Sequence, residues 1–114
     1  MSRLLVTALG MVVALAVGST AFAQDKAAVE KGMKVYTEQK CSLCHAIAGK
    51  GNAKGSLDGV GTKLKAEEIR QWMVDPKGMT AKTKAARKPE MKAYPNLAKE
   101  DMDALVAYML SLKK

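Results

Sequence analysis

The sequence contains few of the side chains from which metal sites, active sites and aromatic cores are usually built. Its 114 residues include one histidine, two cysteines, one tryptophan, three tyrosines and one phenylalanine. A structural zinc site needs four ligands, so such a site would require a carboxylate or a second subunit. With so few aromatic residues, we expect a thin core, and small domains of this kind often depend on a disulfide, a metal or a large apolar cofactor.

The N-terminal segment has the pattern of a secretory signal. Arg3 precedes an almost unbroken apolar run at residues 4–17, and an A-x-A motif follows at 21–23. The run is short for a membrane anchor, and this pattern is typical of a cleaved signal peptide. We therefore predict a signal at residues 1–23 and one domain at residues 24–114. Export, most simply into a bacterial periplasm, is the expected location.

The remaining sequence predicts an all-α domain, because no stretch of four or more residues alternates convincingly as a strand. Helices are expected at about residues 25–40, 66–74 and 99–113, where apolar side chains recur at helical spacing. Pro76 is expected to stop the second helix. A glycine-rich loop at 48–61 and a long basic loop at 75–97 separate the helices. Gly32 is costly inside a helix, which predicts the close approach of another element.

Both cysteines and the only histidine lie in the five residues CSLCH, at 41–45. A thioredoxin-like redox pair is expected in a βαβ context, which this sequence lacks. C-x-x-C-H is the signature of c-type haem attachment. On a helical turn these three positions share one face, so Cys41 and Cys44 can form thioethers with the haem while His45 reaches the iron. Attachment would also protect two thiols that an oxidising compartment would otherwise attack. We predict one covalently attached haem c.

The sixth iron ligand cannot be a second histidine of this chain, so a methionine sulfur is the natural candidate. Four of the methionines after residue 23 fit helical positions or the turn before the haem motif, where they are expected to fill the core. These are Met33, Met73, Met102 and Met109. Met79 and Met91 remain, both in the long basic loop.

Two segments resemble the ends of a small monohaem class I cytochrome c. "GMKVYTEQKCSLCHAIAGKG" is similar to the opening of that family, and "MKAYPNLAKEDMDALVAYMLSL" is similar to its close. The resemblance covers about residues 27–113. It implies three main helices and two long loops wrapped around one covalently bound haem, with Met91 rather than Met79 as the sixth ligand. It also implies that Gly32 and Tyr36 pack against Leu105 and Tyr108.

The resemblance also suggests two residues around the haem, and this sequence departs from the family pattern in two places. Ser56 stands where the family commonly has a proline whose carbonyl accepts the ring proton of the haem histidine, and a serine carbonyl can do the same. The indole of Trp72 is expected to donate a hydrogen bond to a haem propionate. Lys92 replaces the proline that often follows the ligand methionine, which suggests a more mobile loop and a weaker iron–sulfur bond.

Charge and site together predict an electron carrier. The sequence has 19 Lys and Arg against 11 Asp and Glu, and six of these cations lie in residues 77–92, opposed only by Glu90. The run fits either a solvated face or a docking surface for an acidic redox partner. Nucleic acid is not expected, since no binding motif is present.

Nothing resembles a general base or nucleophile, so the chain is not expected to be an enzyme alone, although it could be the haem subunit of one. A second hypothesis is a five-coordinate or labile haem that binds small ligands.

Overall fold

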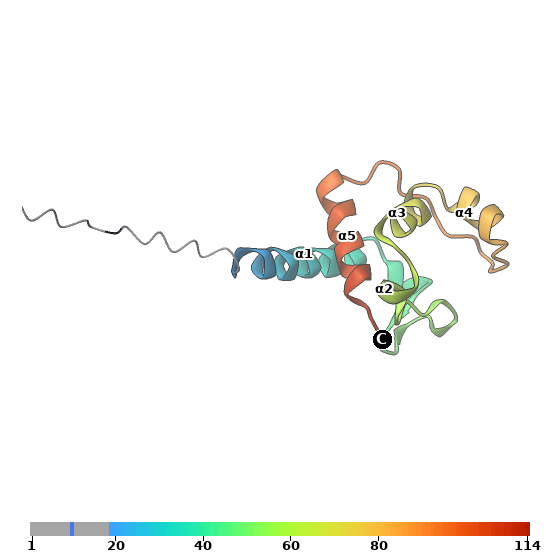
Figure 1. Ribbon diagram of the computed structural model, residues 1–114. Coiled ribbons are helices and arrows are strands. Elements are labelled where there is room, and N and C mark those ends of the chain that lie inside the picture. Colours follow the sequence, from blue (N-terminus) through green and yellow to red (C-terminus); the bar gives the residue numbers. More distant parts are fainter. Residues whose placement is uncertain (1–9, 11–18) are drawn as a thin grey trace, which may run out of the picture.

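The computed structural model describes residues 10 and 19–114, and the helices of this part form most of its structure (Figure 1). The α-helices are α1 (Ser19–Glu38), α2 (Val60–Lys63), α3 (Ala66–Val74), α4 (Pro76–Thr83) and α5 (Lys99–Ser111). Two 3-10 turns, η1 (Cys41–Leu43) and η2 (Ala53–Gly55), and two strands, β1 (Ala46–Ile47) and β2 (Lys50–Gly51), complete the elements. The predicted all-α class is confirmed. Among the described residues, no helix combines the length and apolarity needed to cross a bilayer.

The three predicted helices are all present, and two of them have different ends. The prediction for 66–74 coincides with α3. Helix α5 begins at Lys99 as expected but ends at Ser111. The next carbonyl, that of Leu112, accepts a hydrogen bond from the Gly61 N–H at 2.8 Å and so ties the end of the helix to α2. Helix α1 ends at Glu38, since Lys40 adopts a left-handed conformation with φ of 56°.

Helix α1 begins earlier than expected, at Ser19, and therefore includes the end of the predicted signal peptide. Two of the added residues, Ala21 and Ala23, are alanines, the best helix formers. The rest of the predicted signal lies outside the described residues, apart from Gly10. The boundary between residues 23 and 24 remains a prediction.

Helix α4 corrects the prediction that residues 75–97 form one long loop. Pro76 ends α3 as expected, but it is also the first residue of the next helix, where its missing N–H costs nothing. Asp75 caps this helix, because its carboxylate accepts a hydrogen bond from the Gly78 N–H at 3.1 Å. The segment without regular structure is therefore shorter and runs from Lys84 to Ala98.

A small hairpin follows the CSLCH motif and was not predicted. Strands β1 and β2 are antiparallel, with Ala46 opposite Gly51 and Ile47 opposite Lys50. The two residues between them, Ala48 and Gly49, both have positive φ, as type I′ hairpin turns require. Strands of two residues are too short to show alternation, so the periodicity of the sequence cannot indicate them.

The first and last helices cross closely at Gly32. Figure 1 shows α5 passing across α1. A Cβ atom at Gly32 would overlap the Ala104 carbonyl oxygen and would lie 2.6 Å from the Cβ of Tyr108. Beside this point the rings of Tyr36 and Tyr108 meet edge to face, with their centroids 5.8 Å apart. The predicted close approach at Gly32 is confirmed.

We expect Gly32→Ala to destabilise the domain, although alanine is ordinarily the better residue inside a helix. The added methyl group would force α1 and α5 apart, and overpacking of this kind costs about 1–3 kcal/mol. Urea unfolding of the holoprotein measures the change. Lys34→Ala, at an exposed position of the same helix, is the control and should change the free energy of unfolding by less than about 0.5 kcal/mol. A Gly32→Ala variant as stable as the wild type would contradict the tight crossing.

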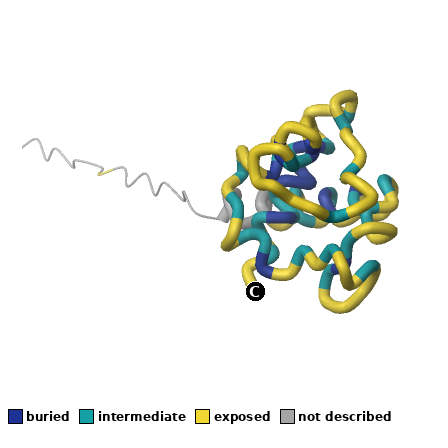
Figure 2. Tube along the Cα trace, turned by 90° about the vertical axis from the view of Figure 1, so that its right-hand side faces the viewer, coloured by how far each residue is buried: buried dark blue, intermediate teal, exposed yellow. Residues whose placement is uncertain are grey.

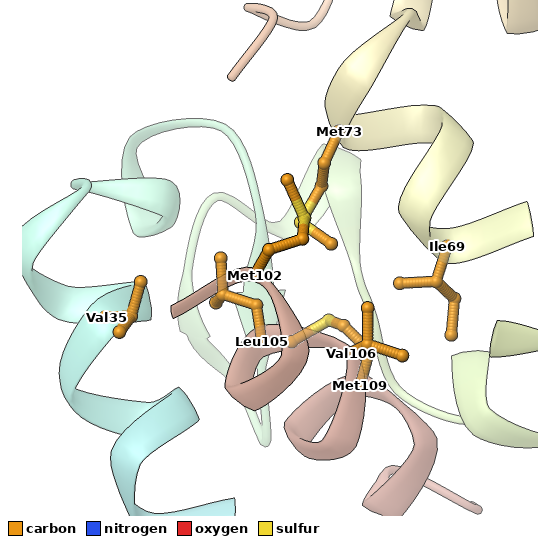
Figure 3. Close-up of a cluster of buried hydrophobic side chains, with 7 residues drawn as sticks. All are labelled: Val35, Ile69, Met73, Met102, Leu105, Val106 and Met109. Carbon is orange, nitrogen blue, oxygen red and sulfur yellow. The ribbon is translucent and has the colours of Figure 1, made fainter. Parts of the chain in front are cut away.

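The core is a single cluster drawn from α1, α3 and α5 (Figure 3). Its buried members are Val35, Ile69, Met73, Met102, Leu105, Val106 and Met109. None of them is aromatic, and three are methionines, whose flexible side chains fill irregular space. The buried positions lie in the interior of the fold and the exposed ones form its outer loops (Figure 2). The expectation of a thin core is therefore confirmed.

Asp103 joins α3 to α5 on the surface. Its carboxylate lies 2.8 Å from Nη2 of Arg70 and 2.9 Å from Nζ of Lys99. Hydrogen bonds from Lys99 and then Arg70 lower the pKa of Asp103. A lowered carboxyl pKa stabilises the fold above the unfolded value of about 3.9, and this stabilisation disappears as the pH falls through the folded value.

We therefore expect Asp103→Asn to lower the melting temperature of the holoprotein slightly at pH 7 and not at acidic pH. Lys99 is largely in solvent and the side chains of Arg70 and Asp103 are about two-fifths exposed, so solvent screens the pairs and the effect at pH 7 is small. Glu67→Gln, an exposed position on α3, is the control and should change the melting temperature little at either pH. A deficit for Asp103→Asn that did not shrink as the pH fell below the unfolded carboxyl pKa of about 3.9 would contradict this origin.

Candidate functional site

The CSLCH motif forms one tight helical turn directly after α1. The carbonyl of Cys41 accepts hydrogen bonds from the N–H of Cys44 at 3.1 Å and from that of His45 at 2.9 Å. Cys41 is half-buried, Cys44 is exposed, and both are free thiols. Burial raises the pKa of the Cys41 thiol. The prediction that the three residues lie on one turn is confirmed.

The ring of His45 is held by the following loop. Its Nδ1 lies 2.9 Å from the carbonyl oxygen of Gly55, and because a carbonyl can only accept, Nδ1 carries the proton. Burial lowers the pKa of His45, and the nearby charge of Arg87 acts in the same direction. The imidazole is therefore neutral at neutral pH and leaves Nε2 free, which is the form that binds a metal.

The prediction that the Ser56 carbonyl accepts this proton is wrong, because the acceptor is the preceding carbonyl. Ser56 pairs with Ala46 in an isolated bridge. Gly55 is the last residue of η2 and Ser56 follows it as the cap, so the carbonyl at the end of this turn, and not the next one, faces the ring. The Ser56 hydroxyl instead accepts a hydrogen bond from the N–H of Asp58 at 3.3 Å.

Asn52 supports the turn, and the sequence analysis missed it. Its N–H lies 3.0 Å from the carbonyl of His45 and 3.2 Å from that of Ser42. Its side-chain amide donates to the Leu43 carbonyl at 3.2 Å. One residue thus binds three carbonyls of the motif. The only signal in the sequence is an asparagine in a glycine-rich loop, which by itself indicates no more than a turn.

The motif opens onto a cavity of about 540 Å³. Cys41, Cys44 and His45 all line it, and the other walls include residues of α2, α3, α4, α5 and the segment 84–98. Its lining is mostly apolar and includes Tyr36, Leu57, Leu64, Trp72, Met73, Tyr94, Leu105 and Met109. Sites for cofactors and other small molecules commonly occupy 300–1,000 Å³, roughly, and combine apolar walls with a few placed polar groups. This cavity has both properties.

The two candidate methionines lie in different places. Met91 is half-buried, packs against the core cluster and lines the cavity. Met79 is buried on α4, with 8% of its surface exposed, and does not line the cavity. The backbone around Met91 is tied to α3, because the Tyr94 N–H donates to the Met73 carbonyl at 2.7 Å. The cavity thus brings Met91, and not Met79, together with the CSLCH motif.

Tyr36 lies beside the cavity at the end of α1. Its hydroxyl is 3.5 Å from the carbonyl oxygen of His45, and burial raises its pKa to about 12. The phenol therefore stays protonated at any pH at which the domain works. It remains able to donate to the backbone of the motif.

The basic run at residues 77–92 lies on α4 and the segment that follows. Five of its six cations are exposed, and Arg87 is half-buried. Glu90, the only acid in the run, lies 3.2 Å from Nζ of Lys88. The net positive charge of the run therefore reaches the solvent beside the cavity.

Comparison with known proteins assigns the chain to a family. The family model described as Cytochrome c matches residues 29–113, so the chain belongs to the cytochrome c family. It is therefore a protein of electron transport that carries covalently bound haem c.

One curated relative matches over much of the chain. The cytochrome c oxidase subunit 2 of Alkalihalophilus pseudofirmus is 33% identical over 92 residues, which cover 73% of this chain and 25% of the relative. The chain thus matches about a quarter of the length of that protein. No solved structure gives a significant match.

The described residues fit a haem. Two thiols and a neutral imidazole come from one turn, a thioether comes from Met91, and all four line one largely apolar cavity. Thioether sulfur with imidazole is the ligand pair of cytochromes c. The chemistry of the donors and the volume of the cavity therefore agree with the family.

Proposed function

We propose that this protein is an exported one-electron carrier with one haem c, attached through Cys41 and Cys44 and ligated by His45 and Met91. The observation that carries the proposal is that all four side chains line one cavity. When bound, the haem supplies an iron that changes between Fe(II) and Fe(III).

The chain supplies the orientation of the ligands. His45 donates its Nδ1 proton to the Gly55 carbonyl, so the imidazole presents Nε2 in a fixed direction. Asn52 holds three carbonyls of the motif. The turn between Cys41 and His45 is therefore held through hydrogen bonds to its own carbonyls, which leaves its thiols and imidazole free for a ligand.

The walls of the cavity set the electrical environment. Apolar side chains from α3 and α5 exclude water and disfavour added positive charge, which raises the reduction potential. A thioether ligand acts in the same direction. The position of Trp72 in this lining supports its proposed role as an indole donor to a haem propionate.

Two occupied axial positions leave no site for a substrate, so the protein transfers electrons between redox partners. The exposed cations of residues 77–92 support a partner with an acidic docking surface. The basic residue and apolar run at the start of the sequence support export to a periplasm.

A second candidate function is the haem subunit of a larger oxidoreductase complex. It is favoured by the similarity to a protein named as a cytochrome c oxidase subunit. In this case the basic run would bind permanently to another subunit rather than to a mobile partner.

Visible absorption of the periplasmically expressed protein tests the proposal in the oxidised state, the reduced state and the reduced state with carbon monoxide. We expect low-spin haem c bands, a weak red band from methionine bound to Fe(III), and no change with carbon monoxide. Ready binding of carbon monoxide would favour a five-coordinate or labile haem that binds small ligands. A colourless protein from a host with working haem-attachment machinery would contradict the haem assignment.

A further inference from the structure

Arg87 differs from the other cations of the basic run in its burial. Lys77, Lys82, Lys84, Lys88 and Lys92 are exposed, whereas Arg87 is half-buried. Arg87 lines the cavity, as the exposed Lys92 also does. Among the described residues, no ion pair involves Arg87. An unpaired guanidinium in an apolar lining is unfavourable unless other groups hold it there.

The guanidinium of Arg87 lies against the loop that holds the histidine. Its Nη1 occupies the space that a Cβ atom at Gly55 would take, and the Cys44 carbonyl lies against the same point. Gly55 is also the residue whose carbonyl accepts the Nδ1 proton of His45. Only a residue without a side chain fits between these groups.

The contact joins two distant segments. Arg87 lies four residues before Met91, in the segment 84–98, while His45 follows η1 and Gly55 ends η2. Arg87, from the segment that carries the proposed methionine ligand, therefore contacts Gly55, the residue whose carbonyl holds the His45 ring.

We infer that Arg87 is a positioning residue that acts through Gly55 on His45 and raises the reduction potential of the haem. The inference rests on the proposed function, because it requires His45 to ligate iron. A fixed positive charge beside the imidazole opposes further positive charge at the ligand and its metal, and the oxidised iron carries one charge more than the reduced iron.

The test is the reduction potential of the holoprotein in wild type and three variants. Arg87→Gln removes the charge, Arg87→Lys keeps it, and Lys82→Gln removes an exposed charge from α4 as the matched control. For Arg87→Gln we expect a shift toward the oxidised form of about tenfold, which is about 59 mV for one electron. Lys82→Gln should shift the equilibrium less than about threefold, because solvent and salt screen an exposed charge. Arg87→Lys should lie between wild type and Arg87→Gln.

Equal shifts in Arg87→Gln and Lys82→Gln would overturn the inference, since the effect would then be one of net charge alone. If Arg87→Gln yields no holoprotein, Arg87→Met takes its place, because an uncharged chain of similar reach suits the apolar lining. The same tenfold shift is expected there, and a potential equal to that of the wild type would overturn the inference. A failure of the proposed function is seen separately, because the wild type itself would then lack haem c bands.

Discussion

Replacing Met91 with leucine is expected to open the haem iron to carbon monoxide and to abolish the weak red band of the oxidised protein. Leucine keeps the volume and apolarity of the side chain but has no sulfur, so the sixth ligand alone is removed. We expect the reduction potential to fall by on the order of 0.1 V, within the roughly 0.8 V range over which axial ligands set haem potentials.

Met79→Leu is the matched control for this experiment. Met79 is buried on α4 and does not line the cavity, so the variant should keep the red band and exclude carbon monoxide. A volume-conserving change of this kind costs less than about 1.5 kcal/mol. The reverse pattern would assign the ligand to Met79. If both variants kept the red band and excluded carbon monoxide, the sixth ligand would be another methionine of the cavity lining, Met73 or Met109.

The double variant Cys41→Ser, Cys44→Ser is expected to lose all covalently bound haem. Serine is nearly the same size as cysteine but cannot form a thioether, so the turn can fold while attachment fails. Haem staining of the protein on a denaturing gel measures the loss, since only attached haem remains with the chain.

Ser42→Ala is the control, because Ser42 is an exposed residue between the two cysteines and should retain full staining. Retention of stain in the double variant would contradict attachment at these thiols. We also expect a lower melting temperature for the double variant. A core of seven buried side chains without an aromatic ring leaves a small domain dependent on its cofactor.

The helices could be predicted where apolar spacing, capping residues and prolines within the same segment determine them. The apolar spacing of residues 66–74 matches α3 in full, and the helical Gly32 indicated a close contact before its partner was known. Asp75 and Pro76 were also informative, but the prediction used the proline only as a stop. A capping residue followed by a proline can end one helix and also begin the next. Asp75 and Pro76 begin α4 in this way.

The residues of the site also fall into a group that local sequence predicts and a group that it does not. Cys41, Cys44 and His45 are neighbours in sequence, so their spacing alone predicts a shared face. The supporting contacts of Gly55, Asn52 and Arg87 depend on how two loops return to the turn, and no local pattern encodes this. The error at Ser56 has this origin, because which of two successive carbonyls faces the ring is decided by the bridge between Ser56 and Ala46.

The crossing of α1 and α5 also bears on the order in which the chain can fold. The side chains of Lys31 and Glu100, 69 positions apart, meet where these helices run together, and closing so large a loop carries an entropic cost that is recovered only when the last helix docks. A growing chain that ends before residue 99 has no partner for the Gly32 face, and α5 also forms part of the cavity wall. The CSLCH turn and its supporting residues lie within residues 41–55, whereas this wall comes from the last helix. We therefore expect the two thiols to stay open to haem attachment for as long as α5 has not docked.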